Sequence, residues 1–286
     1  MSDPEKDEAT GTETTGHEWD GIKELDTPLP RWWLWTFYAT IIWGVLYTIA
    51  YPAWPMISTA TTGVLGYSSR GELAQTIANH EAALTGVNTQ LANASFDDIA
   101  SNPDLNQYAQ AGGASVFRTY CSQCHGAGAA GLPGYPNLVD DDWLWGGTRD
   151  DIAMTIRHGI RWDDDEDTRF SQMPAFGDDG VLTSEEIEAV ASHVRAFSGL
   201  SQDNAEGAQI YADNCASCHG ESGEGDREQG APNLADAIWL YGGDQASVVS
   251  TITHARHGVM PAWGNRLSDA QIKQLAMYVH GLGGGE

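Results

Sequence analysis

One five-residue pattern, Cys-x-x-Cys-His, occurs twice in this chain and uses all four of its cysteines. The copies run from Cys121 to His125 and from Cys215 to His219. The pattern is typical of covalent c-type haem attachment, in which two thiols add to the vinyl groups of haem and the histidine becomes an axial ligand of the iron. A zinc site would need its second cysteine pair about 15–20 residues further on, and a dithiol redox site would need a βαβ context that the sequence lacks. We therefore expect two covalently bound haem c groups.

The residues around each motif repeat as well. A glycine stands eight residues before the first cysteine of each copy, at Gly113 and Gly207. After the motif come Pro-Asn-Leu, Trp-Leu-aromatic-Gly-Gly and Met-Pro-Ala-aromatic-Gly, and each copy closes with a helix that begins in a capping-box sequence. No period-two alternation indicates strands. We therefore expect an all-α fold in which one transmembrane helix precedes two tandem class I cytochrome c domains, at residues 112–199 and 204–282.

The Met-Pro pairs are the candidates for the second axial ligand of each iron. Met173 lies 48 residues after His125, and Met260 lies 41 residues after His219. A lone methionine more often fills a core, but two methionines at matching places favour ligation by their soft thioether sulfur. Iron with histidine and methionine ligands has no open site, so we expect single-electron transfer and no catalytic residues.

A membrane anchor is expected near the N-terminus. Residues 32–51 contain no charge, and 16 of these 20 residues are apolar. Twenty helical residues span about 30 Å, the thickness of the bilayer core, and aromatic residues flank both ends. A cleaved signal peptide would have a short basic leader, whereas this leader is long and acidic. We expect a transmembrane helix over residues 32–54, stopped by Pro52 and Pro55.

Basic residues near this helix predict its orientation. Lys23 and Arg31 lie just before it, and the next basic residue is Arg70, so the bias places the N-terminus in the cytoplasm. Residues 1–31 then form an acidic cytoplasmic tail, and we expect its first 27 residues to lack regular structure. The haem domains are expected to be periplasmic, on the outer side of a bacterial inner membrane that the chain crosses once.

Residues 55–111 contain no cofactor motif and are expected to form a periplasmic helical spacer. The sequence predicts a helix over residues 70–84, ended by Gly86, and a second helical stretch over residues 95–110 around Pro103.

The charge is strongly acidic, with 14 basic and 40 acidic residues and a formal net charge of −26. Such a surface excludes general nucleic-acid binding, which needs basic residues against phosphates. The first copy carries about nine extra residues before its methionine, including five acidic residues at positions 163–167. This insert is either a solvated loop or a docking edge for a basic donor, and the acidity as a whole is either a docking feature or an adaptation to salt.

With these residues assembled, the chain resembles the dihaem subunit III of cbb3-type cytochrome c oxidase. The resemblance rests on the haem motifs and on segments outside them, namely His17-Glu-Trp-Asp-Gly-Ile22, Tyr51-Pro-Ala-Trp-Pro55, Ser171-Gln-Met-Pro-Ala-Phe-Gly177 and the segment from His254 to Trp263. It implies that electrons arrive from a cytochrome bc complex or a soluble cytochrome c. They would pass through a monohaem cytochrome subunit to the haem–copper catalytic subunit, which reduces O₂.

The resemblance also implies how the ligands are shared. Cys121, Cys124, His125 and Met173 would serve one haem, and Cys215, Cys218, His219 and Met260 the other. Two other functions remain open from the residues alone: a free-standing membrane-anchored dihaem carrier, or the cytochrome subunit of a periplasmic dehydrogenase. A haem-based gas sensor would need a labile axial ligand, and the two methionines argue against it.

Overall fold

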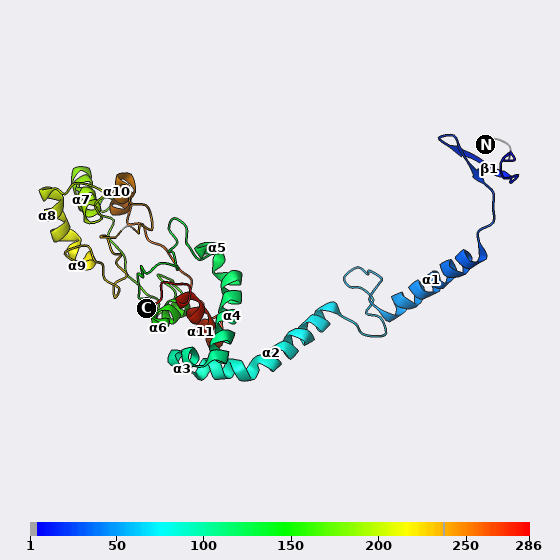
Figure 1. Cartoon of the computed structure of the whole chain (residues 1–286), viewed down its shortest axis with the longest axis horizontal. Helices are drawn as coiled ribbons and strands as arrows, with labels where there is room; N and C mark the ends of the chain where they lie inside the picture. The colour runs from blue at the N-terminus through cyan, green and yellow to red at the C-terminus, as the bar shows by residue number, and fades with distance from the viewer. Residues whose placement is uncertain (1–4, 237) are drawn as a thin grey trace. The chain divides into compact units, whose positions relative to one another are not determined.

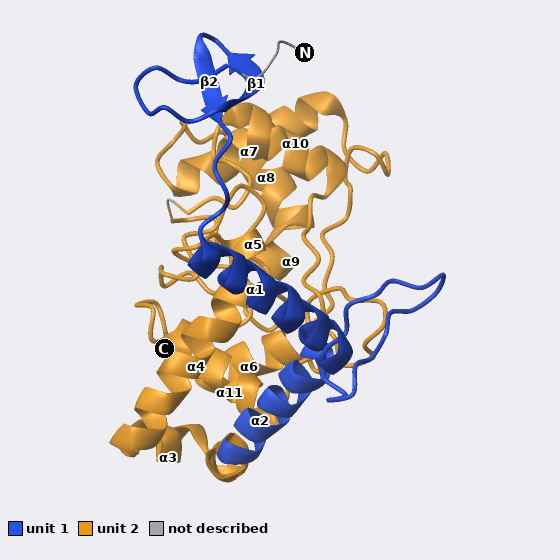
Figure 2. Cartoon of the chain, turned by 90° about the vertical axis from the view of Figure 1, so that its right-hand side faces the viewer, with its two compact units in different colours: residues 1–83 blue, residues 84–286 orange. Residues whose placement is uncertain are grey.

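The computed structural model describes residues 5–236 and 238–286 (Figure 1). The chain divides into two compact units, residues 1–83 and residues 84–286, which Figure 2 shows in blue and orange. Each unit is considered by itself below.

The first unit begins with a β-hairpin rather than an irregular tail. Strands β1 (Thr14–Trp19) and β2 (Ile22–Leu25) pair antiparallel, with Trp19 opposite Ile22. The turn between them is formed by Asp20 and Gly21, whose φ angles are 49° and 85°. Two consecutive positive φ angles match the right-handed twist of a hairpin, and Asp-Gly is a sequence that adopts them readily. The expectation that this tail lacks regular structure is therefore wrong for residues 14–25.

Helix α1 (Arg31–Ala50) contains no charged residue after Arg31 and buries none of its residues within the protein. Of the helices that the structure describes, it alone has the length and composition to cross a membrane. The chain then folds back onto its C-terminal end, where Val64 and Leu65 donate backbone hydrogen bonds of 3.0 and 3.1 Å to carbonyls of the last turn. The helix ends at Ala50, four residues before the expected boundary, with Tyr51 as its C-cap and Pro52 as the next residue.

The spacer contains a longer helix than expected. Helix α2 (Ser69–Asn93) continues through Gly86, where a side chain would meet open space. The helix extends past this glycine because Leu91, near its end, is completely buried in the core of the second unit. Helix α3 (Phe96–Ser101) follows, and helix α4 (Pro103–Tyr120) begins with Pro103 in its first turn and runs on into the first cysteine motif.

The second unit holds both repeats. Its remaining helices are α5 (Ser122–His125), α6 (Arg149–His158), α7 (Ser184–Phe197), α8 (Ala205–Asn214), α9 (Ala216–His219), α10 (Gln245–His254) and α11 (Asp269–His280). The two expected capping boxes are confirmed: Thr183 caps α7 with Glu186, and Ser268 caps α11 with Gln271.

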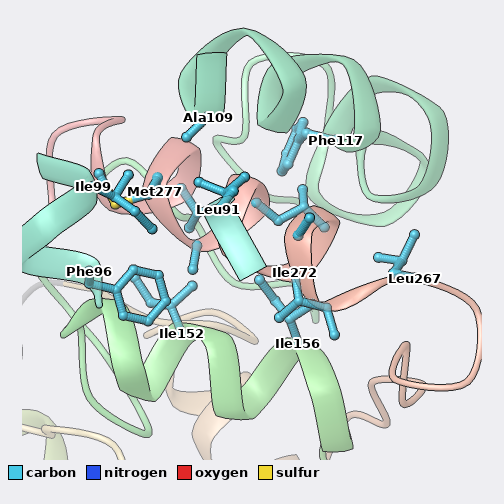
Figure 3. Packing of buried hydrophobic residues seen from close by; sticks show 14 of the residues in the cluster. Leu91, Phe96, Ile99, Ala109, Phe117, Ile152, Ile156, Leu267, Ile272 and Met277 are labelled. Atoms are coloured by element: carbon cyan, nitrogen blue, oxygen red, sulfur yellow. The ribbon is translucent and has the colours of Figure 1, made fainter. Parts of the chain in front are cut away.

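The two hydrophobic cores of this unit each combine residues from both repeats. The first core joins α4 and α6 of the first repeat to α11 of the second, and Figure 3 shows Phe117, Ile152 and Ile272 among its residues. The second core joins α7 of the first repeat to α8 and α10 of the second. The repeats at 112–199 and 204–282 are therefore copies in sequence, but neither encloses a complete core.

Each repeat contributes its last helix to the core of the other, and this exchange occurs where two chain segments cross. Ile160 and Met260 share two backbone hydrogen bonds, of 2.9 and 3.0 Å, in an antiparallel bridge. On the other side, Phe176 and Asp178 each donate a 3.1 Å backbone hydrogen bond to carbonyls at the end of α10. The segment after α6 thus passes to the second core, and the segment after α10 returns to the first.

The glycines that precede each cysteine motif let two helices approach closely. A Cβ on Gly113 would lie 2.1 Å from the carbonyl oxygen of Gln274 in α11, and one on Gly207 would lie 2.3 Å from that of Ala189 in α7. These positions explain why the glycine is repeated.

We expect Gly113→Ala to destabilise the protein by about 1–3 kcal/mol, because the added methyl group overlaps backbone that cannot move freely. Gly86→Ala is the matched control, since it also replaces a glycine inside a helix but meets no atom within 4 Å. The control should raise stability by up to about 1 kcal/mol through helix propensity. Chemical denaturation of both variants measures this difference, and equal effects would contradict the packing described here.

Candidate haem sites

Both cysteine motifs form a single helical turn at the end of a longer helix. In the first, the backbone amides of Cys124 and His125 donate to the carbonyl of Cys121, at 3.1 and 3.0 Å. The second motif repeats this geometry, with Cys218 and His219 donating to Cys215 at 3.1 and 3.0 Å. All four thiols are free, and in each motif the first is partly buried and the second exposed. The turn places two thiols and an imidazole together, as covalent haem attachment requires.

The two motif histidines are held in the protonation state that iron binding needs. The Nδ1 atom of His125 donates to the carbonyl oxygen of Pro136 at 3.1 Å, and that of His219 donates to Pro232 at the same distance. Burial lowers the pKa of both imidazoles, so they are neutral, and Nε2 remains available as a ligand. This contact gives the repeated Pro-Asn-Leu sequence a role that inspection of the sequence did not find.

The methionines lie in cores other than those expected. Met260 packs against the core that includes Cys121, and Met173 packs against the core that includes Cys215. This packing runs against the pairing of Met173 with the first motif and of Met260 with the second, which the resemblance implies. The physical reason is the crossing of the two segments described above, which carries each methionine into the core of the other repeat.

Two equivalent tryptophans test whether the sites suit a haem group. The Nε1 of Trp143 donates to the carbonyl oxygen of Gly284 at 2.5 Å. The Nε1 of Trp239 is buried and has no hydrogen-bond partner within the described part of the chain. A buried N–H without an acceptor costs about 1–3 kcal/mol, so this donor suits an acceptor supplied by a bound group, such as a haem propionate. The second site therefore fits haem.

Other histidines are engaged in local contacts. His158 pairs with Asp165 at 3.0 Å and His254 with Asp178 at 2.9 Å, while the Nδ1 of His257 donates to the carbonyl of Ala255. These contacts agree with polar structural roles.

Arg161 is a site residue that the sequence did not reveal. Its Nε donates to the carbonyl of Gly258 and its Nη1 to that of Ser171, both at 2.7 Å. It thereby ties together the two segments that lead to Met260 and Met173. The signal in the sequence is weak, since a single arginine beside an acidic insert resembles a surface residue.

A cavity of about 800 Å³ lies beside Cys218. Its wall combines residues from Ala216 to Ile238 of the second repeat, not all of that range, with Asp141, Asp142 and Trp143 of the first. Burial, with the nearby carboxylates of Asp236 and Asp140, raises the pKa of Asp142 to about 6 from 3.8.

The raised pKa of Asp142 predicts that the stability of the folded protein depends on pH. The folded protein binds the Asp142 proton more tightly than the unfolded chain, so stability falls as the pH rises from about 4 to about 6 and stays lower above that range. Asp142→Asn should therefore raise the melting temperature at pH 7.5 and leave it unchanged at pH 4. The exposed Asp163→Asn removes the same charge as a control. A gain from Asp142→Asn that is equal at both pH values would contradict this reading.

Comparison with known proteins identifies the family. A model of the N-terminal domain of cytochrome oxidase-cbb3, FixP, matches residues 11–58, and a model of cytochrome C oxidase, cbb3-type, subunit III matches residues 109–194 and 202–279. The chain is 55% identical to the cbb3-type cytochrome c oxidase subunit CcoP of Cereibacter sphaeroides over 286 residues, 99% of each chain. It is 54% identical to subunit FixP of Sinorhizobium medicae over 100% of both chains, and 52% identical to FixP of Bradyrhizobium diazoefficiens over 99% of this chain and 98% of that one.

These matches cover the anchor segment and both repeats, which is more of the chain than the haem motifs alone. The chain therefore belongs to the subunit III family of cbb3-type cytochrome c oxidases and is a dihaem electron-transfer cytochrome.

Proposed function

We propose that the two haems are held by ligand sets that each combine both repeats. The first set is Cys121, Cys124, His125 and Met260, and the second is Cys215, Cys218, His219 and Met173. The observation that carries this proposal is the packing of Met260 with the core of Cys121 and of Met173 with the core of Cys215. When bound, the haem iron supplies reversible one-electron chemistry.

The protein's own residues would set the conditions for that chemistry. The carbonyl oxygens of Pro136 and Pro232 orient the two imidazoles and increase their basicity through the Nδ1 hydrogen bonds. A methionine sulfur would favour ferrous iron and raise the reduction potential. With each iron held by a histidine and a methionine, neither site would bind O₂ or substrate, and the chain would act only as a relay.

The relay would run within an oxidase complex. Electrons would come from a cytochrome bc complex or a soluble cytochrome c and pass to a monohaem cytochrome subunit. They would then reach the haem–copper catalytic subunit. Helix α1 would anchor the chain in lipid of a bacterial inner membrane, and the positions of Lys23 and Arg31 support a cytoplasmic N-terminus with periplasmic haem units.

Copurification tests the assignment to a complex. Affinity purification of the tagged, full-length chain from its own membranes should yield a haem–copper subunit with O₂-reducing activity, and haem staining should mark this chain. A dihaem chain that purifies alone under mild detergent would instead support a free-standing carrier.

Single-haem variants test the exchanged ligands. In Cys215→Ala/Cys218→Ala protein, the remaining haem is attached at Cys121 and Cys124. We expect Met260→Leu to abolish the methionine-to-iron charge-transfer band and lower the reduction potential in this background, because leucine keeps the volume but not the sulfur. Met173→Leu is the matched control and should preserve both signals. If Met173→Leu instead abolished these signals and Met260→Leu preserved them, Met173 would be the ligand of the haem attached to Cys121 and Cys124.

A further inference from the structure

The loops that follow the two cysteine motifs differ sharply in charge. Residues 126–139, after the first motif, contain no charged side chain. Residues 220–235, after the second, contain Glu221, Glu224, Asp226, Arg227 and Glu228. Since the two loops occupy equivalent places in the repeat and hold their histidines by the same carbonyl contact, this difference is not required for binding haem.

The acidic residues of the second loop gather around an attachment cysteine. Glu224, Asp226 and Glu228 line the cavity of about 800 Å³ beside Cys218, which is the exposed cysteine of its motif. We call the six carboxylates of its wall the acidic rim, and they are Asp141, Asp142, Glu224, Asp226, Glu228 and Asp236.

This negative charge is poorly neutralised within the protein. The one basic residue in the cavity wall, Arg227, is paired with Glu286 near the C-terminus. The crowding of carboxylates also contributes to the raised pKa of Asp142. A concave surface lined by charge of one sign attracts a partner of the opposite sign over a longer range than a flat one.

The first loop presents a different surface. Leu132 and Tyr135 are 57% and 44% exposed there, and Val139 is 39% exposed. An uncharged surface of this kind cannot steer a charged protein toward the first haem site.

We propose that the acidic rim is the docking surface for an electron-donor protein with a lysine- or arginine-rich face, so that electrons enter the chain at the haem attached to Cys215 and Cys218. This inference rests on the proposed relay between two haems. Electrons would then pass to the haem attached to Cys121 and Cys124, and the carboxylates would act by attracting and orienting the donor, without contact with the iron.

The acidic insert at residues 163–167 is the competing surface. It carries five carboxylates but no attachment cysteine, and Asp165 is already engaged with His158. Its flanking residues Arg161 and Arg169 supply positive charge, although both also make hydrogen bonds within the protein. The insert therefore offers a control surface with similar charge and no attachment cysteine within it.

Two triple variants of the full-length, haem-loaded chain test the proposal. The rim variant is Asp141→Asn/Glu224→Gln/Glu228→Gln, and the insert variant is Asp163→Asn/Asp164→Asn/Glu166→Gln. All six residues are exposed, and each variant removes three negative charges. The probe is a reduced, lysine-rich cytochrome c, and stopped-flow absorbance measures its second-order rate constant for electron transfer.

At an ionic strength near 10 mM, where the Debye length is about 30 Å, the rim variant should lose at least about fivefold in rate and the insert variant less than about twofold. At high salt, the rim variant and the unmodified protein should converge. Equal losses in both variants, a larger loss in the insert variant, or no loss in the rim variant would overturn the proposal.

A small uncharged reductant separates this inference from the proposed relay. If the rim is the docking surface, all three proteins should be reduced by it at the same rate. Haem staining that fails, or a haem that no reductant reduces, would count against the relay itself, whereas intact and reducible haems with an unchanged donor rate in the rim variant would count against the docking surface alone.

Discussion

The backbone pairing between Ile160 and Met260 is the constraint on which the haem-bearing unit depends. Two hydrogen bonds join these residues, and Arg161 adds two more contacts, to Gly258 and Ser171. This crossing sends the segment with Met173 into one core and the segment with Met260 into the other. Each core is therefore completed by the other repeat, and neither repeat can bury its own apolar surface alone.

The two cores differ in how far apart along the chain their helices lie. The second core is built from α7, α8 and α10, which follow one another along the chain, whereas the first core is closed by α11 only after the chain returns. The first core therefore requires contacts between residues far apart in sequence, and loop closure must be completed before these contacts stabilise it. For an electron relay, the exchange also holds two redox sites in one unit, because each core contains residues of both repeats.

The two haem sites have the same local geometry but differ in the charge of the residues around them. The repeats keep the same histidine contact and the same motif geometry, so the local chemistry of the two sites is matched. Their surroundings differ, with carboxylates beside one cysteine pair and an uncharged loop beside the other. A duplicated domain can in this way supply two similar carriers while only one of them recognises a charged partner.

The sequence by itself determined the cofactor, the repeat, the anchor and the helix caps. These features depend on neighbours in the chain: Cys-x-x-Cys-His needs one helical turn, a capping box spans four residues, and an uncharged run of 20 residues needs no partner to be recognised. The N-terminal hairpin was also encoded locally, by Asp20-Gly21, but that signal was overlooked.

Only the tertiary structure decided into which core each methionine packs. Repeats that share their motifs can close on themselves or exchange their last helices with similar side-chain contacts, because α7 and α11 share four buried apolar positions and the same type of cap. The choice depends on pairing between segments about 100 residues apart, through Ile160, Met260 and Arg161. The reach of α2 past Gly86 was decided in the same way, because burial of Leu91 outweighs the local cost of a glycine in a helix.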